Sequence, residues 1–326
     1  MKFYLAPLEG ITGYIYRNAY DDCFHSVDKY FTPFIAANPH GKCSSREWSD
    51  ICNEHNTGKT VIPQILTNKS EDFIATARML QSIGYNEVNL NLGCPSGTVV
   101  SKNRGSGFLS KPDDLQRFLE EVFSALDMKV SLKTRIGKDS PEEFARLMEI
   151  YNQYPLEELI IHPRIQKDYY KNKPNLTVFK EAFENASVPI VYNGDIFTVK
   201  DYHNLLQICP DLSTLMLGRG IIANPGLVGE IITGKMMNKE EFRAFHDRLL
   251  EGYKEVLYGD RNVLFKMKEA WFYMNYMFSN VSKYVKKIRK SQNLQDYTIV
   301  VDQLFMEQEL VPGAGLFFTP SSIDEE

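Results

Sequence analysis

A single cysteine follows the clearest buried strand that the sequence predicts. Residues 87–92 form that predicted strand, and Cys94 comes two residues later on a turn framed by Gly93 and Pro95. A thiol at a strand end is placed to act on a bound ligand, as a nucleophile or as an acid. The alternative, a small buried apolar side chain, suits a polar, glycine-rich turn less well. We therefore predict that Cys94 is catalytic, and that the long segment 96–110 after it is a lid.

Polar side chains also end several other predicted strands. Gln64 and Asn91 carry amide groups suited to the edge of a heteroaromatic ring, and His162 and Arg164 follow a later strand. Because the carboxyl ends of barrel strands meet at one mouth, we expect these residues to converge. The alternatives are a structural hydrogen bond for each amide and a satisfied core histidine for His162.

Lys133 interrupts an otherwise apolar strand. A buried lysine needs an anionic partner or a lowered pKa. Three interpretations remain open: a Schiff-base nucleophile, a cation beside an electron-rich cofactor, and a buried ion pair with Glu87 or Asp195.

The last two predicted strands end in residues suited to phosphate. Glycines let backbone N–H groups approach phosphate oxygens, and an arginine binds them bidentately. In a barrel these two loops are the usual phosphate site. The alternatives are tight turns for the glycines and a surface salt bridge for the arginine. The residues are Asn193, Gly194, Asp195, Gly218, Arg219 and Gly220.

Short apolar runs separated by helical periodicity must position these side chains. Eight runs alternating with helices over about 235 residues predict a TIM (β/α)8 barrel, with an open doubly wound sheet as the alternative. The runs are 3–8, 30–37, 60–67, 87–92, 129–135, 158–162, 189–193 and 214–218.

The alternation of short apolar runs with helical segments ends after Gly234. The pattern then predicts helices over 238–257, 262–277 and 281–293, with no strands. We therefore expect a catalytic barrel domain over 1–237 and a smaller all-helical C-terminal domain over 238–326, ending in a short acidic tail from residue 320.

Composition limits the class of protein. No run of 18 apolar residues occurs, and the apolar part of the N-terminus is too short for a signal peptide, which predicts a cytoplasmic protein without a membrane span. Five scattered cysteines without CxxC spacing and six histidines without a metal motif predict no metal site.

The net charge of −5 disfavours a nucleic-acid partner, but its distribution is uneven. Residues 261–290 hold eight basic side chains against one acid. This stretch is either a solvated helical face or a phosphate-contacting patch.

Taken in order, the motifs resemble the tRNA-dihydrouridine synthase family. The resemblance covers about residues 3–232, and the element around Cys94 together with the order of the motifs makes it specific. The matching segments are 6–12, 63–65, 91–95, 133–135, 162–164, 193–196 and 218–220.

The resemblance implies an FMN-dependent barrel that reduces uridine to 5,6-dihydrouridine in tRNA, with NADPH or NADH as electron donor. Flavin N5 would deliver hydride to C6 of uracil, and Cys94 would donate a proton to C5. Asn91 and Arg164 would bind the substrate base.

The same resemblance implies the cofactor site. Lys133 and His162 would contact the isoalloxazine, Gln64 its pyrimidine edge, and Pro7 and Leu8 would pack beneath it. The ribityl phosphate would be held by Asn193, Gly194, Asp195, Gly218 and Arg219.

A uridine inside folded tRNA must be flipped out to reach a barrel mouth. The stretch 261–290, with Lys286 and Lys287 and with Trp271 and Tyr273 interleaved, would grip the RNA backbone, although such aromatics are more often helix core. No stable protein partner is implied. Segments 165–167 and 173–176 depart from the family pattern, which affects the expected base contacts.

Three other functions compete with this one. A flavin barrel acting on another RNA, such as rRNA, or on a free pyrimidine-like metabolite would keep most of the site. A Schiff-base aldolase would use Lys133 but leave Cys94 unexplained. An RNA-binding protein without catalysis would not need Cys94, Lys133 or Arg219.

Overall fold

The computed structural model describes residues 1–317, so the predicted acidic tail at 320–326 lies outside the described residues. All strand pairings recorded in the sheet are parallel. The strands are β1 (Lys2–Leu5), β2 (Lys29–Phe31), β3 (Ile35–Ala36), β4 (Val61–Ile62), β5 (Gln64–Leu66), β6 (Glu87–Leu92), β7 (Lys129–Arg135), β8 (Leu159–His162), β9 (Ile190–Tyr192) and β10 (Thr214–Leu217).

The sheet closes into a barrel. Its strand order is β3-β5-β6-β7-β8-β9-β10-β1-β2-β4. Only Thr32–Phe34 separate β2 from β3, and only Pro63 separates β4 from β5. β2 and β3 thus form one run of chain, and β4 and β5 form another. Each of these two runs has one strand at either end of the strand order, so the two ends join and the ten short strands make a ring of eight. Proline explains the interruption at residue 63, because it has no N–H to donate to a neighbouring strand. The predicted TIM barrel is confirmed.

The chain divides into two compact units. The barrel unit consists of Met1–Glu9, Asp28–Gly194 and Leu206–Met216, and the helical unit of Gly10–Val27, Asp195–Leu205 and the residues from Leu217 on. The sequence boundary at residue 237 stays a prediction.

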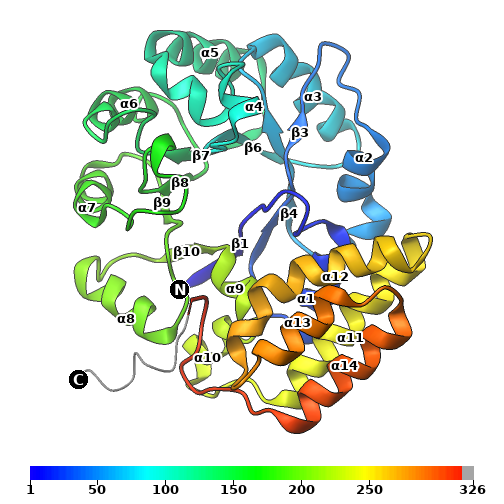
Figure 1. Cartoon of the computed structure of the whole chain (residues 1–326). Coiled ribbons are helices and arrows are strands. Elements are labelled where there is room, and N and C mark those ends of the chain that lie inside the picture. Colours follow the sequence, from blue (N-terminus) through cyan, green and yellow to red (C-terminus); the bar gives the residue numbers. More distant parts are fainter. Residues whose placement is uncertain (318–326) are drawn as a thin grey trace. The chain divides into compact units, whose positions relative to one another are not determined.

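Helices of the barrel unit lie outside its strands, as Figure 1 shows for α3, α5, α6 and α7. Acidic residues open α3 and a proline opens α5, both of which favour a helix N-terminus. The helices are α2 (Ser45–Ile51), α3 (Ser70–Ser82), α4 (Gly97–Val100), α5 (Pro112–Ala125), α6 (Glu143–Tyr151) and α7 (Leu176–Asn185).

Charged residues form a cluster at the amino ends of the barrel strands. Lys29 Nζ lies 2.9 Å from Glu87 Oε2 and 3.2 Å from Glu158 Oε2, and Tyr4 donates to Glu158. Burial raises the pKa of Glu87, while Lys29 opposes that rise. The ion pair between Lys133 and Glu87 that the sequence left open is therefore wrong, because Lys29 is the cation beside Glu87.

The helical unit packs around an aromatic core. Trp271 Nε1 donates to Tyr297 Oη at 2.7 Å, and His246 Nε2 lies 2.6 Å from the same oxygen. Figure 1 shows α11 to α14 side by side, and contacts join α11 to α12 and α13 to α14. The helices are α1 (Tyr14–Phe24), α8 (Val199–Ile208, most of it in this unit), α9 (Arg219–Ala223), α10 (Leu227–Thr233), α11 (Lys239–Val256), α12 (Asp260–Met274), α13 (Ser282–Lys290) and α14 (Leu294–Glu307).

Sequence patterns predicted α11 to α13 closely but not α14. That helix contains Thr298, Ile299, Val300 and Val301, a β-branched run that disfavours a helix locally. Its side chains Tyr297, Val301, Leu304 and Phe305 are nevertheless buried. Tertiary packing overrides propensity here.

Candidate functional site

Two sets of hydrogen bonds fix the position of Cys94. On one side, Asn91 Oδ1 accepts from the backbone N–H groups of Gly93 at 3.0 Å and Cys94 at 2.9 Å. On the other, the Cys94 carbonyl accepts from Ser106 N at 3.1 Å and Ser106 Oγ at 2.8 Å. The strand end and the following segment therefore hold the cysteine between them.

The segment after Cys94 is folded. It contains α4 and a 3-10 helix over Gly105–Ser110, and residues 105–109 are buried. Gly105 has φ +55°, and a Cβ there would lie 2.8 Å from the Cys94 carbonyl oxygen. The glycine is thus required by close packing against the cysteine. Residues 105–109 are buried and support Cys94 from within the fold, and a lid role stays a prediction for residues 96–104 only.

Cys94 is held mainly as the neutral thiol. Burial raises the pKa of its thiol, and the nearby Glu9 carboxylate acts in the same direction. The Ser96 N–H and the cations Arg135 and Lys133 oppose that rise. The result favours a proton donor over a thiolate nucleophile at neutral pH.

A chain of side-chain amides crosses three strands beside this turn. Asn91 Nδ2 donates to Gln64 Oε1 at 2.7 Å, and Gln64 Nε2 donates to Asn89 Oδ1 at 2.8 Å. Asn89 Nδ2 in turn donates to Ser131 Oγ at 2.9 Å. Gln64 and Asn91 are thus oriented by each other before any ligand binds. Their predicted roles at the flavin edge and the substrate base stay predictions.

Among the described residues, the Lys133 side chain has no partner in a hydrogen bond or ion pair. It lies opposite Asn91 in the register of β6 and β7. Within residues 1–317 no hydrogen bond or ion pair joins its ammonium group to the protein. Burial, and then the positive charge of Arg135, lower the pKa of Lys133 to about 7. A half-buried ammonium of this kind suits an anionic or electron-rich ligand.

His162 is held as a neutral ring. Arg164 Nη1 lies 3.0 Å from His162 Nε2. Because a guanidinium only donates, Nε2 accepts and the ring proton is on Nδ1. Arg164 is 2% exposed, and its Nε donates to the Asn172 carbonyl at 2.5 Å. Arg164 thus has His162 and Asn172 as local partners. Its contact with a substrate base stays a prediction.

Arg135 is a positioning residue that we did not predict from the sequence. Its guanidinium donates to the carbonyls of Gly93, Ile165 and Tyr169, each at 2.9 Å. Burial lowers the pKa of Arg135 to about 10. It joins the Cys94 turn to the loop after β8. Its place in a strand-end motif was the available signal, but the motif does not reveal its partners.

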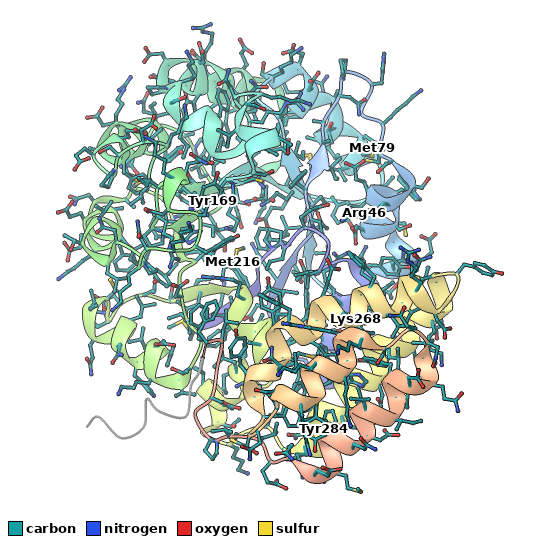
Figure 2. The ribbon with its side chains drawn as sticks, viewed as in Figure 1. Arg46, Met79, Tyr169, Met216, Lys268 and Tyr284 are labelled. Carbon is teal, nitrogen blue, oxygen red and sulfur yellow. The ribbon has the colours of Figure 1, made fainter. Side chains whose placement is uncertain are left out.

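Pro7 and Leu8 follow β1 and are both half-buried. Leu8 packs against the apolar cluster that fills the barrel. Met216 of this cluster is labelled in Figure 2. The cluster consists of Tyr4, Ala6, Phe31, Ile62, Ile160, Val191 and Met216.

Two of the predicted phosphate residues belong to the barrel unit. Asn193 Nδ2 donates to the Met216 carbonyl at 2.8 Å. A Cβ on Gly194 would lie 2.0 Å from the Tyr192 hydroxyl. Packing against Tyr192 therefore already favours glycine at 194, and phosphate binding by Asn193 and Gly194 stays a prediction.

The other phosphate candidates belong to the helical unit. Arg219 Nη2 lies 2.7 Å from Asp195 Oδ1, and the guanidinium stands 5.3 Å from the ring centroid of Phe197. Gly218 immediately precedes Arg219 at the start of α9. Asp195 thus orients Arg219, which is the salt-bridge alternative of the sequence analysis. Phosphate binding by these residues stays a prediction.

The basic stretch 261–290 separates into two classes. Lys266 donates to the Gly10 carbonyl and Lys268 to the Ser291 carbonyl, so both support the helical unit. Trp271 is 2% exposed and belongs to the core. Exposed side chains without an ion pair to any residue of 1–317 are Arg261, Lys286, Lys287, Arg289 and Lys290.

No helix within residues 1–317 is long and apolar enough to cross a membrane. No group of three or more histidine, cysteine or acidic side chains in the same range is arranged to hold a metal ion.

This chain is similar to known proteins in sequence and in fold. Similar proteins include tRNA-dihydrouridine synthase B of Pasteurella multocida, 26% identical over 228 residues that cover 69% of this chain and 67% of the relative. Another is tRNA-dihydrouridine(16) synthase of Haemophilus influenzae, 24% identical over 317 residues that cover 93% of this chain and all of the relative. Among solved structures, morphinone reductase has the same fold, with a TM-score of 0.52 at 14% identity over 75% of this chain and 88% of that one.

The family comparison covers almost the whole chain. The profile described as "Dihydrouridine synthase (Dus)" matches residues 4–311. This range includes the strand ends of the barrel, Cys94 and the helices up to α14. The chain belongs to the dihydrouridine synthase family.

Proposed function

We propose that this protein reduces uridine to 5,6-dihydrouridine in tRNA, with FMN as cofactor and NADPH, or NADH, as electron donor. The observation that carries the proposal is Cys94, a thiol of raised pKa on a turn fixed by Asn91 and Ser106, in a chain of the dihydrouridine synthase family.

The chemistry needs an acid on one side of the uracil ring. FMN would supply the hydride, delivered from N5 to C6 of uracil. Cys94 would break its S–H bond and give the proton to C5, and solvent would then return a proton to the thiolate. A raised thiol pKa keeps the donor protonated at neutral pH.

The residues around Cys94 fit an isoalloxazine ring. Lys133 brings a positive charge without a protein partner, which suits the N1–C2 side of the ring, where negative charge gathers on reduction. His162, held neutral by Arg164, carries a ring N–H donor. Gln64 is oriented by Asn89 and Asn91 to present its amide edge.

Asp195, Gly218 and Arg219 of the helical unit would bind the phosphate end of FMN, and the phosphate roles of Asn193 and Gly194 stay predictions from the sequence. In this arrangement Arg219 binds the phosphate, and Asp195 holds its guanidinium in place. The apolar surface of Pro7 and Leu8 would support the ring.

The RNA would be bound through its backbone. Lys286 and Lys287 are exposed on α13, and neither side chain forms an ion pair or hydrogen bond with a carboxylate of residues 1–317. Such cations bind phosphates and release counterions, which helps to offset the cost of flipping the uridine, about a few kcal/mol.

Mapping of dihydrouridine in cells with and without this protein tests the proposal. We expect specific uridines of tRNA to lose the modification when the protein is removed and to regain it when the gene is restored. Loss of dihydrouridine from rRNA alone would show that the substrate is rRNA rather than tRNA. No RNA change would favour a free pyrimidine-like metabolite. Purified protein without an absorbance band near about 450 nm would exclude a flavin.

A further inference from the structure

The loop after β8 combines exposed aromatic and basic side chains. Tyr169 is 45% exposed and Tyr170 49%. Lys171 and Lys173 are exposed and form no ion pair with any residue of 1–317, whereas Lys167 lies 2.8 Å from Asp139. Aromatic faces alternating with free cations are the surface that single-stranded nucleic acid binds.

The two tyrosines of this loop are not equivalent. The Tyr170 ring lies 5.7 Å from the Arg135 guanidinium and 6.1 Å from the His162 ring, so it is part of the internal packing of the site. The Tyr169 ring has no aromatic or hydrogen-bonding partner among residues 1–317. Only Tyr169 therefore offers an unoccupied ring face.

Tyr169 is held in a strained backbone conformation. Its φ of 49° and ψ of −97° are unfavourable for a residue with a side chain, at a cost of about 1–3 kcal/mol. The strain persists because Arg135 binds the Tyr169 carbonyl at 2.9 Å and the Tyr169 N–H bonds to the Gln166 carbonyl at 3.2 Å. Glycine would adopt this conformation without strain, so the presence of tyrosine indicates that the ring is used.

The same loop is attached to the Cys94 turn. Gln166 Nε2 donates to the Pro95 carbonyl at 3.3 Å, and Arg135 donates to the Gly93 carbonyl at 2.9 Å. The first bond joins Pro95 directly to the loop of Tyr169, and the second does so through Arg135, which also binds the Tyr169 carbonyl. Figure 2 shows Tyr169 beside the strands of the barrel unit. The backbone of Tyr169 is therefore held in place relative to the Cys94 turn.

We propose that Tyr169 is a stacking platform for the nucleotide next to the target uridine, and that Lys171 and Lys173 bind the adjoining phosphates. This inference rests on the proposed function. A uridine that is flipped out leaves its neighbour without a stacking partner. Stacking on Tyr169 replaces that partner, so the ring contributes to RNA affinity and to the choice of sequence around the target.

Three variants at one position separate the ring from the backbone. Tyr169→Gly removes the ring and relieves the strain, Tyr169→Ala removes the ring and keeps the strain, and Tyr169→Phe keeps the ring. With unmodified tRNA carrying the mapped target, we expect Tyr169→Gly and Tyr169→Ala to raise KM roughly 5- to 150-fold, the range of one base stack, with a smaller change in kcat. Tyr169→Phe should behave like the wild type.

A binding experiment adds a readout that does not depend on turnover. A transcript with 2-aminopurine on either side of the target is mixed with each flavin-loaded protein. On one side, we expect quenched fluorescence with the wild type and Tyr169→Phe, and bright fluorescence with Tyr169→Gly. Equal fluorescence and equal KM for the wild type and Tyr169→Gly would overturn the inference, while a wild type that makes no dihydrouridine on any tRNA would overturn the proposed function instead.

The lysines are tested by salt dependence. Lys171→Ala with Lys173→Ala should reduce the slope of log affinity against log salt by about 1 to 2, because two phosphate contacts are lost. Lys167→Ala, in the same loop but paired with Asp139, is the matched control and should leave the slope near that of the wild type. An unchanged slope in the double variant would remove these lysines from the interface.

Discussion

At the scale of single residues, the surroundings of Cys94 raise the pKa of its thiol, whereas those of a nucleophilic cysteine lower it. A nucleophilic cysteine needs a base or a field that stabilises its anion. Around Cys94 burial and Glu9 act against the anion, and Lys133 and Arg135 only partly oppose them. The cysteine is therefore suited to hold a proton and to release it when a carbanion-like centre needs it.

Replacing Cys94 by alanine should leave RNA affinity and flavin content unchanged and reduce the rate of dihydrouridine formation by about 10²- to 10⁴-fold, the usual contribution of a positioned acid. Single-turnover measurements on unmodified tRNA give this rate. Because burial raises the thiol pKa above its ordinary value, the wild-type rate should fall through loss of this proton only at a higher pH than an exposed cysteine would set. An alanine variant with the normal rate would exclude the role.

Lys133→Met should stabilise the flavin-free protein at pH 7 and below. The lysine pKa is lowered from 10.5 to about 7 in the folded state, so the unfolded chain binds the proton more tightly. The penalty, up to about 5 kcal/mol, is fully present below pH 7 and disappears as pH rises to 10.5. Thermal melts from pH 6 to 10 should show the variant's advantage shrinking. A constant advantage would contradict the lowered pKa.

At the scale of elements, the loops at the strand ends are tied to neighbouring strands and loops as well as to their own strands. Arg135, at the end of β7, reaches the turn after β6 and the loop after β8. Asn91 and Gln64 similarly join β6 to β5. Such bonds fix the distances between catalytic side chains, and small displacements at this scale reduce turnover strongly.

Arg135→Lys should therefore fold but lose activity. An ammonium on a flexible stem cannot replace three guanidinium bonds in different directions, so at least one buried carbonyl loses its donor, at about 1–3 kcal/mol each. We expect a lower melting temperature and a fall in kcat, with RNA affinity less affected. Lys129→Arg, exposed at the other end of the same strand, is the control. A wild-type kcat in Arg135→Lys would show that the clamp does not position the site.

At the scale of the whole molecule, charge is unevenly distributed. The net charge is −5, yet α13 carries the exposed side chains Lys286, Lys287, Arg289 and Lys290, which form no ion pair with any carboxylate among the described residues. An acidic protein repels RNA in general, so a local cation cluster both attracts it and sets where it docks.

Charge reversal at Lys286 and Lys287 should weaken tRNA binding and flatten its dependence on salt, because two phosphate contacts and their counterions are lost. Filter binding across salt concentrations measures both. Reversal of Lys254, on α11 and paired with Glu251, is the control and should change neither. A salt slope unchanged by the double reversal would remove α13 from the interface.

Prediction from sequence succeeded where local pattern decides. The alternation of apolar runs with helical periodicity predicted the eight-stranded barrel, because strands covered on both faces need continuous apolar runs. It also predicted α11 to α13 from their amphipathic spacing. It missed α14, whose β-branched run is helical only because its apolar face is buried against the other helices.

Local sequence patterns were thus enough to predict the barrel, Cys94 just after one of its strands, and polar residues at the ends of others. The contacts of these residues became known only from the fold: Lys29 rather than Lys133 lies beside Glu87, Arg135 joins two loops, and Trp271 lies in the helical core. The physical reason is that these contacts join residues 26 to 58 positions apart or lie on neighbouring strands, where closure of the barrel and packing of helices set the distances.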